Sequence, residues 1–159
     1  MALQDGVAYR AVLRTARGDI AIRLLPEVAP LTVNSFVFLA EEGYFAGSSF
    51  HRVIPGFIAQ TGDPTGTGRG TPGYRLPDEL SDEPFEAGAV AMAKAGPDSN
   101  GSQFFIVLDD ARHLDGRFTL FGRVVEGLEV ARALAPRDPA AGRELPRGDA
   151  LQAVEIVTG

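Results

Sequence analysis

Apolar and polar positions alternate along several short segments of the chain, a pattern typical of β-strands with one buried face. Residues 7–15 and 20–25 alternate in part on either side of a turn, where Gly18 can adopt a positive φ. These two segments predict a β-hairpin. Further strands are predicted over residues 85–93, 103–108 and 118–125, and over 150–158, a closing strand that can pair with the first.

Two other segments have helical periodicity. Within residues 30–42 apolar side chains recur at the spacing of one helix face, a proline stands in the first turn, and Gly43 follows as a stop signal. Residues 128–135 predict a shorter helix that ends before Pro136. The apolar stripe of the longer helix is expected to pack on a sheet or on the end of a barrel.

The segments 63–77 and 136–149 are rich in glycine and proline, and they predict long surface loops. The first loop contains G-R-G-T-P-G at 68–73, which formally matches the G-x-G-x-x-G pattern of dinucleotide-binding proteins. That interpretation fails because Pro72 lies inside the motif and no helix pattern follows it. Many short strands with two helices therefore predict an antiparallel β architecture, in which closure into a barrel removes exposed edges.

Length and composition limit the possible functions. The 159 residues suit a single domain over 1–159, and no run of apolar residues is long enough to span a membrane. The net charge is −6 with scattered basic residues, which argues against nucleic-acid binding. There are no cysteines, and the two histidines lack a metal-ligand spacing, so no metal is expected. Without a secretory signal, a cytoplasmic monomer is expected.

The candidate chemistry is concentrated in residues 50–63. Five apolar side chains there are interleaved with one guanidinium, Arg52, and one amide, Gln60, around a turn at residues 55–56. This combination suits an apolar pocket with a fixed hydrogen-bond donor at its edge.

The same stretch, F-H-R-V-I-P-G-F-I-A-Q-T-G-D, resembles the signature F-H-R-x-I-P-x-F-x-x-Q-x-G-D of the cyclophilin-type peptidyl-prolyl isomerases. A second family segment, G-P-x-S-N-G-S-Q-F-F-I, is matched at 96–106. The resemblance covers nearly the whole chain. It implies a mainly β fold, a closed eight-stranded antiparallel β-barrel capped by two α-helices with its site on the outer face. It also implies cofactor-free cis-trans isomerisation of X–Pro bonds in proline-containing peptides and unfolded protein chains.

The resemblance assigns roles to individual residues. Arg52 matches the catalytic arginine, which can hold the prolyl carbonyl and donate a hydrogen bond toward the imide nitrogen. Gln60 and Gln103 match the amides that orient this arginine and bind the substrate backbone. Ala93 and Lys94 match a segment that binds the substrate through its own main chain, so the side chain at 94 is free to vary. The walls of the proline pocket are matched by Phe57, Ile58, Phe105 and Leu114, and Phe57 joins Arg52 and Gln60 in the predicted catalytic set.

Two further substrate-binding positions depart from the family pattern. His113 stands where animal members have a tryptophan that is prominent in cyclosporin binding, so cyclosporin is expected to bind weakly at most. Phe118 stands where many members have a histidine at the pocket edge. Because an aromatic wall remains there, catalysis is expected to persist with a changed preference for the residue before proline.

Two alternatives remain open. His51 stands beside Arg52 and suggests a catalytic base acting with Ser48, Ser49 or Ser102, but the chain has no G-x-S-x-G motif and no acid partner. A structural, hydrogen-bonded histidine is favoured, and a hydrolase is the least favoured function. The second alternative is a non-catalytic module or chaperone that binds proline-containing partners without isomerising them.

Overall fold

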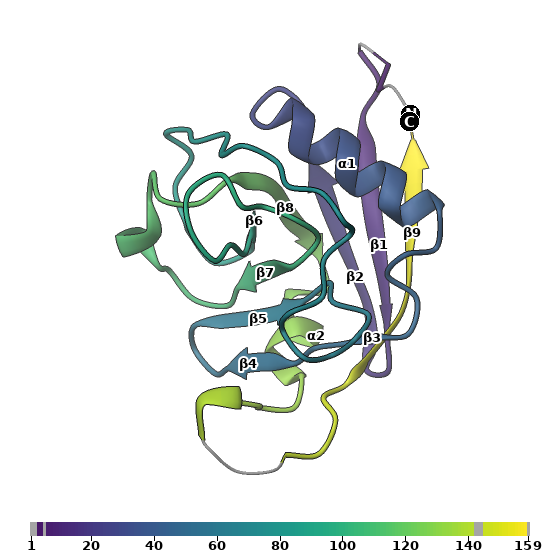
Figure 1. The fold of residues 1–159 in the computed structure, drawn as a ribbon, viewed down its shortest axis with the longest axis vertical. Helices are drawn as coiled ribbons and strands as arrows, with labels where there is room; N and C mark the ends of the chain where they lie inside the picture. Colours follow the sequence, from purple (N-terminus) through teal and green to yellow (C-terminus); the bar gives the residue numbers. More distant parts are fainter. Residues whose placement is uncertain (1–2, 5, 142–144, 159) are drawn as a thin grey trace.

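The computed structural model describes residues 3–4, 6–141 and 145–158, and it shows a strongly curled β-sheet with two α-helices (Figure 1). The strands are β1 Tyr9–Thr15, β2 Gly18–Leu24, β3 Ser48–Ser49, β4 Arg52–Ile54, β5 Ile58–Thr61, β6 Ala89–Met92, β7 Phe104–Val107, β8 Leu120–Glu126 and β9 Ala150–Thr158. They form one sheet in the order β3-β9-β1-β2-β8-β6-β7-β5-β4. Every pairing between neighbours is antiparallel. The mainly β fold predicted from the sequence is confirmed.

The predicted hairpin and closing strand are both present. β1 and β2 pair in register from Arg10 opposite Arg23 to Thr15 opposite Gly18, and Gly18 has the positive φ that the turn needs. β9 pairs with the other edge of β1, from Tyr9 opposite Thr158 to Thr15 opposite Leu151. The N-terminal hairpin and the last strand therefore form one continuous three-stranded unit.

The barrel differs in one detail from the eight strands expected. β3 and β4 stand at opposite ends of the strand order, yet only Phe50 and His51 separate them in the chain. The stretch bends here because its first half pairs with β9 and its second half with β5. The structure therefore has nine strands in one curled sheet where a closed barrel of eight is expected, and its two end strands are linked only through Phe50 and His51.

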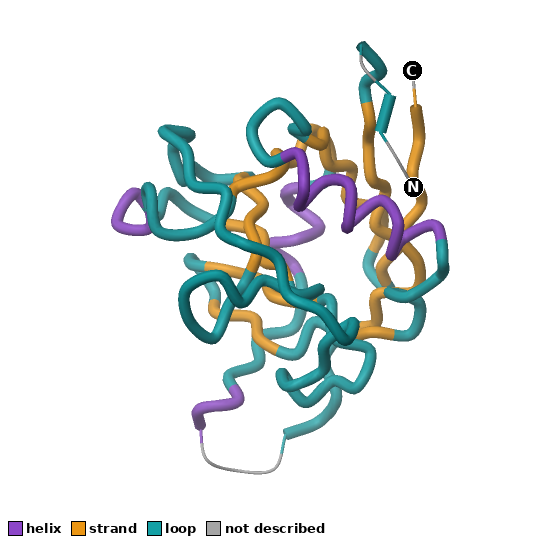
Figure 2. The backbone as a smooth tube through the Cα atoms, turned by 45° about the horizontal axis from the view of Figure 1, so that its top comes forward, coloured by secondary structure: helices purple, strands orange, loops and turns teal. Residues whose placement is uncertain are grey.

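The helix α1 (Pro30–Glu41) lies across β1, β2 and β9 (Figures 1 and 2). Its residues Val33, Phe36 and Val37 enter the inner core, which also contains Leu13 of β1 and Ile22 of β2. The shorter helix α2 (Leu128–Ala133) packs against β2. Neither helix has the length and apolar content needed to cross a membrane.

Strands β6 and β7 are buried on both faces, which explains why their sequences are continuously apolar. Phe104 and Ile106 point into the inner core, whereas Phe105 and Val107 belong to a second buried cluster on the outer face. This second set, the outer apolar cluster, comprises Leu25, Ile58, Phe85, Ala89, Ala91, Phe105, Val107, Ala111 and Leu120. The expected location of the site outside the barrel thus has an apolar foundation of its own.

Several element ends differ from those predicted. The segment 85–93 forms a strand only over β6, because Gly88 precedes it with φ +94°, outside the strand region. The helix α2 ends two residues early, where Leu134 is extended. The predicted loop 136–149 contains a short 3₁₀ turn, Pro139–Ala141, and its residues 142–144 lie outside the described part of the chain. The loop 63–77 has only an isolated bridge between Leu76 and Asn100.

The inner core is centred on a group of aromatic rings contributed by α1, the segment after it, β7 and β8. The ring of Phe104 lies 5.3 Å from that of Phe36, 5.7 Å from that of Phe45 and 6.2 Å from that of Phe121, each nearly edge-on. These separations are those at which aromatic rings attract one another. Phe104 therefore contacts three other rings of the group, including Phe36 of α1.

We predict that Phe104→Ala lowers the free energy of unfolding by about 3–5 kcal/mol, because the ring is fully buried and the cavity cannot close. Urea denaturation followed by circular dichroism measures this change. The matched control is Leu80→Ala, at a side chain that is 53% exposed, which should change stability by less than about 0.5 kcal/mol. Equal effects of the two substitutions on the free energy of unfolding would contradict a central role of Phe104 in the inner core.

Candidate active site

Strand pairing places three of the predicted site residues in one row across the outer face of the sheet. Arg52 on β4 lies opposite Gln60 on β5, and Gln60 lies opposite Phe105 on β7. Directly opposed side chains point to the same face of a sheet. The row continues to Ala91 on β6. A charged, an amide and two apolar side chains thus follow one another at right angles to the strands.

The outer apolar cluster supplies the surface beside this row. Ile58 and Phe105 are buried within it, each only 3% exposed. Four more predicted site residues pack against the cluster and remain partly accessible: Phe57, Ala93, Leu114 and Phe118. They come from the β4–β5 turn, the end of β6, the 3₁₀ turn Arg112–Leu114 and the segment before β8. Segments far apart in sequence therefore form one partly exposed apolar patch.

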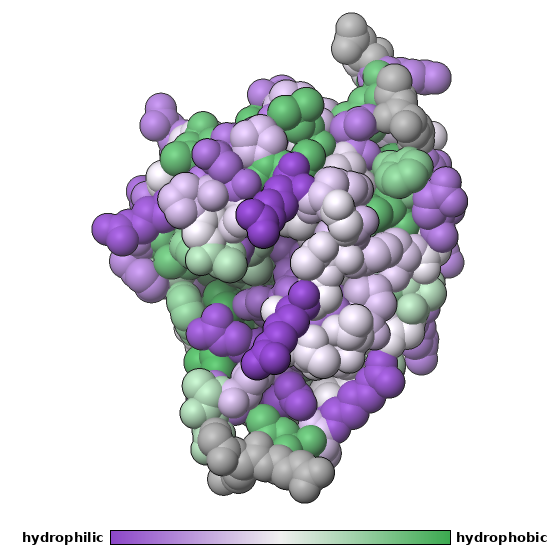
Figure 3. Space-filling view, in the orientation of Figure 1, coloured by the Kyte–Doolittle hydropathy of each residue, from purple (hydrophilic) through white to green (hydrophobic). Residues whose placement is uncertain are grey.

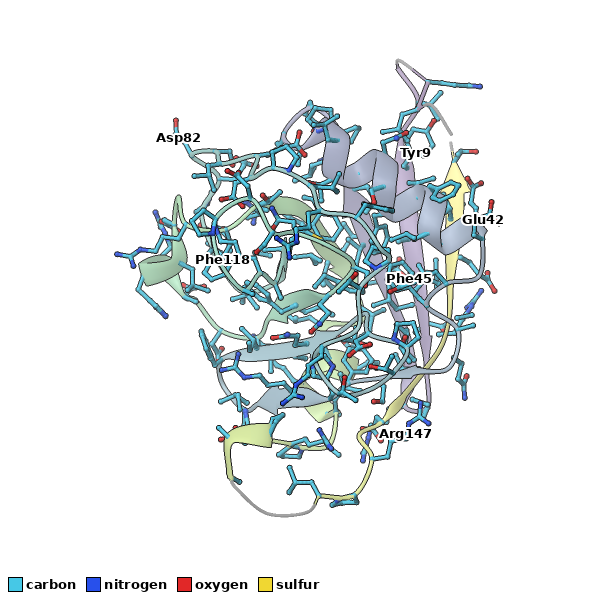
Figure 4. The ribbon with its side chains drawn as sticks, in the orientation of Figure 1. Tyr9, Glu42, Phe45, Asp82, Phe118 and Arg147 are labelled. Atoms are coloured by element: carbon cyan, nitrogen blue, oxygen red, sulfur yellow. The ribbon has the colours of Figure 1, made fainter. Side chains whose placement is uncertain are left out.

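Aromatic contacts fix the orientation of this patch. The rings of Phe105 and Phe118 meet edge to face, with centroids 5.5 Å apart and planes at 90°. The imidazole of His113 stacks on Phe57 at 5.7 Å and 26°. Phe118 of this patch and Phe45 of the inner core lie in different parts of the molecule (Figure 4). Two aromatic pairs thus orient the patch, and neither pair includes a ring of the inner core.

The two predicted amides are hydrogen-bonded to each other. Gln60 Nε2 donates to Gln103 Oε1 at 3.1 Å, and Gln103 Nε2 donates to the carbonyl oxygens of Gly68 at 2.9 Å and Gly70 at 3.4 Å. These bonds tie β5 to the glycine-rich loop and fix which way both amides point. Within the described residues no acceptor binds the guanidinium of Arg52, so its donors are available to a ligand.

A cavity of about 830 Å³ adjoins the row on the side of the amides. Gln60, Ala93, Lys94 and Gln103 line it, and its other walls are the loop at 68–75 and the turn at 95–102. Its volume lies within the range of small-molecule and peptide side-chain sites. Figure 3 shows a hollow on this face with strongly hydrophilic side chains on either side of it.

Sequence comparison places this geometry in a known family. Residues 10–156 match the profile of the family described as cyclophilin-type peptidyl-prolyl cis-trans isomerase/CLD. The chain belongs to this family. Its curated relatives include a peptidyl-prolyl cis-trans isomerase of Synechococcus elongatus, 44% identical over 151 residues that cover 94% of this chain and 97% of that protein. Peptidyl-prolyl cis-trans isomerase B of Bacillus subtilis is 51% identical over 121 residues, covering 75% and 85% respectively.

Solved structures agree with this assignment. A crystal structure of a cyclophilin-type isomerase from Cryptosporidium parvum superposes with a TM-score of 0.85 at 29% identity, covering 96% of this chain and 99% of that one. A second structure of that protein, in the presence of the dipeptide Ala-Pro, gives a TM-score of 0.84 at 30% identity, covering 94% and 99%. The fold and the isomerase activity of this cyclophilin are thus those predicted from its two sequence motifs.

Lys94 has a more definite place in this cyclophilin than the sequence suggested. The family resemblance predicts that the backbone at 94 binds the substrate and that the side chain is free to vary. In the structure, Lys94 Nζ lies 3.0 Å from Asp78 Oδ2 and 5.3 Å from the centre of the Phe118 ring. Both partners of the ion pair are nearly buried, with side-chain exposures of 14% and 13%. The ammonium group thus contacts the aromatic wall of the patch, and its position is held by a carboxylate.

Sequence reasoning missed Asp78 and its partner Asn100. Burial alone would raise the pKa of Asp78, but hydrogen bonds from Asn100 and Lys94 outweigh it and hold the pKa below its usual value. Asn100 is fully buried and donates to Asp78 Oδ1 at 2.8 Å and to the Leu76 carbonyl at 3.1 Å. No local pattern marks such a contact between separate loops. The one signal in the sequence for a carboxylate partner is Lys94 itself, a lysine at a position that lines a binding surface.

His51 is buried, 4% exposed, as a structural histidine would be. Its Nδ1 has no hydrogen-bond partner among the described residues, whereas the Ser49 backbone and the Gln103 side chain lie within hydrogen-bonding reach of the ring and act to raise its pKa. No hydrogen bond joins the imidazole to the hydroxyl group of Ser48, Ser49 or Ser102 in the described structure, and Ser102 Oγ instead donates to the Gly62 carbonyl at 2.7 Å. The geometry therefore offers no activated serine.

Burial lowers the pKa of His51, and the nearby carboxylate of Asp63 offsets this only in part. The folded protein consequently resists protonation of this imidazole, while the unfolded chain accepts a proton near pH 6.5. As the pH falls below that value the unfolded state binds more protons, so stability decreases.

We predict that the free energy of unfolding decreases as the pH is lowered from 7 to 5.5, by at most about 1.4 kcal/mol per pH unit for this single group. Urea denaturation at a series of pH values measures the slope. The His51→Gln protein, which cannot titrate at this position, should show a flatter dependence over the same range. An unchanged slope in that protein would rule out His51 as its source.

Proposed function

We propose that the protein accelerates rotation about X–Pro bonds by binding the proline ring against the apolar patch while Arg52 stabilises the twisted amide. The observation that carries this proposal is the row on the outer sheet face. There, a guanidinium without an acceptor among the described residues lies opposite Gln60, and Phe105 lies on the other side of Gln60 in the same row. Charge and apolar surface are thus available to the same ligand.

The chemistry needs only a modest reduction of the barrier. Rotation about a peptide bond faces about 18–20 kcal/mol, because the nitrogen lone pair is delocalised into the carbonyl. X–Pro bonds interconvert in tens to hundreds of seconds, so a turnover of about 10–10³ per second needs a reduction of roughly 4–8 kcal/mol. Binding and electrostatic stabilisation of the twisted bond can supply that amount without a nucleophile or an acid–base pair.

Arg52 is suited to this electrostatic role. When the amide twists, the lone pair returns to the imide nitrogen, which then becomes a hydrogen-bond acceptor. The guanidinium is permanently charged and presents several donors in a fixed plane, so it can contact the prolyl carbonyl and the imide nitrogen. The apolar surroundings strengthen such a bond because they exclude water.

The remaining residues hold the substrate. Phe57, Ile58, Phe105, Leu114 and Phe118 would contact the proline ring. Gln60 and Gln103 would bind the peptide backbone, since their mutual hydrogen bond uses only part of their capacity. Ala93 and Lys94 border the same surface and would align the main chain. The Cryptosporidium relative determined in the presence of Ala-Pro supports an X–Pro peptide as the ligand.

The finer expectations from the sequence stay predictions. They are action on unfolded protein chains, weak binding of cyclosporin, a monomeric state and a cytoplasmic location. His113 stacks on Phe57 through its imidazole, a smaller ring than the indole of the animal proteins, which is consistent with weak cyclosporin binding.

We predict that Arg52→Ala lowers kcat/KM by roughly 10²–10³, the loss typical of one preorganised donor. The cis-to-trans relaxation of a short X–Pro peptide, followed by NMR exchange, measures it. Arg52→Lys is the matched variant. It keeps the charge but loses the planar group of donors, so its kcat/KM should lie between those of the wild type and Arg52→Ala. An Arg52→Ala protein with full activity would exclude the mechanism, and peptide binding retained by this variant would separate binding from catalysis.

The proposed mechanism also predicts how the catalytic activity depends on pH. Arginine does not titrate near neutrality, and no acid–base pair takes part, so kcat/KM should be nearly constant between pH 6 and 8. The same relaxation assay in buffers of constant ionic strength checks this. A bell-shaped profile would indicate a titrating catalytic group and would contradict the mechanism.

A further inference from the structure

The cavity of about 830 Å³ adjoins the active site, and binding of the proline ring does not explain its role. It shares Gln60, Ala93 and Gln103 with the site, but Phe57 and His113 do not line it. A client chain whose proline lies on the apolar patch would therefore place a neighbouring residue in this cavity. This inference rests on the proposed function, because it assumes that a client proline binds to the apolar patch.

The charges around the cavity have one sign. Three basic residues, Arg69, Arg75 and Lys94, are among its lining residues, and no aspartate or glutamate is. Lys94 is neutralised by Asp78, but neither arginine makes an ion pair with a carboxylate in the described structure. This local excess of positive charge contrasts with the net charge of −6 for the whole chain.

The loop that carries Arg69 is held from below by a buried carboxylate. Asp63 accepts hydrogen bonds from the backbone N–H of Gly68 at 2.8 Å and of Gly70 at 3.0 Å, the two residues that flank Arg69. Burial alone would raise the pKa of Asp63, but hydrogen bonds from Thr65, Gly70 and Gly68 outweigh it and keep the pKa low. The carboxylate stays ionised at neutral pH, so the loop backbone is fixed.

Arg75 has a comparable support. The next residue, Leu76, forms an isolated bridge with Asn100, with Leu76 N donating to the Asn100 carbonyl at 2.7 Å. Asn100 is itself fully buried and bound to Asp78. Both arginines thus extend from backbone that is held on either side or next to them, which reduces the backbone entropy lost when they bind a ligand.

We propose that Arg69 and Arg75 make this cavity a subsite for an anionic side chain of the client, so that the isomerase prefers X–Pro segments with a carboxylate or a phosphate group near the proline. The guanidinium groups offer paired donors of the geometry that both anions accept. Acidic client segments would bind more tightly, whereas basic ones would be repelled.

The test is a set of X–Pro peptides in which glutamate, glutamine or lysine occupies each position on either side of the dipeptide in turn. NMR exchange measures kcat/KM for each peptide. At one position glutamate should exceed glutamine by about three- to tenfold, the effect of one or two partly exposed charge-assisted contacts. The advantage should largely disappear at about 0.5 M salt because the charges are then screened. Phosphoserine at the same position distinguishes the anions, since the one that fits better gives the larger gain.

Charge reversal provides the decisive comparison. In Arg75→Glu, and in the double variant with Arg69→Glu, the preferred side chain at that position should change from glutamate to lysine. Arg10→Glu is the matched control for Arg75→Glu, since this exposed residue on β1 does not line the cavity and the net charge changes by the same amount. There the glutamate preference should persist.

Two results would overturn the proposal: equal rates for glutamate and glutamine at every position in the wild type, or a glutamate preference that survives both reversals. In either case the glutamine peptides would still be isomerised. Failure of the proposed function would instead appear as no acceleration of any peptide, so the two failures are distinguishable. Arg69→Gln and Arg75→Gln, which remove charge without reversing it, keep the test available if a reversed variant fails to fold.

Discussion

The site depends on one constraint, the antiparallel register of β4, β5, β7 and β6. Because side chains alternate between the two faces of a strand, this register sends Phe104 and Ile106 inward and Phe105 outward in the same short strand. A shift of one residue would exchange the faces and would bury Arg52 in the core. The apolar residues that stabilise the barrel therefore also determine where the guanidinium points.

A second layer of order comes from buried polar groups in the loops. Asp63 binds the backbone of the glycine-rich loop, and Asn100 joins the segment at 76–78 to the turn before β7. Buried polar groups of this kind are costly unless paired, so the hydrogen bonds that Asp63 and the Asn100 amide nitrogen make favour one loop conformation over others. The surface around the site is thus shaped by specific polar contacts, although it contains little regular structure.

The sequence allowed the hairpin, α1, the closing strand and the outer position of the site to be predicted, because periodicity and the two long motifs bear on these directly. It did not allow the ends of β6 or the bend between β3 and β4 to be predicted, since both depend on which strands lie alongside. The same limit applies to Asp78, whose partners Lys94 and Asn100 are distant in sequence. Local patterns reveal which residues can take part in a site, and tertiary contacts decide which partners they have.

The bend between β3 and β4 makes completion of the sheet depend on a strand that is synthesised late. Ser48 and Ser49 pair with Leu151 and Ala150, so residues about one hundred positions apart must meet before the two ends of the sheet are joined. Arg52 is the first residue of β4, directly after that bend. During translation the arginine is made early, but the strand that anchors its neighbours emerges from the ribosome much later. Nascent chains are therefore expected to lack a competent site until β9 is available.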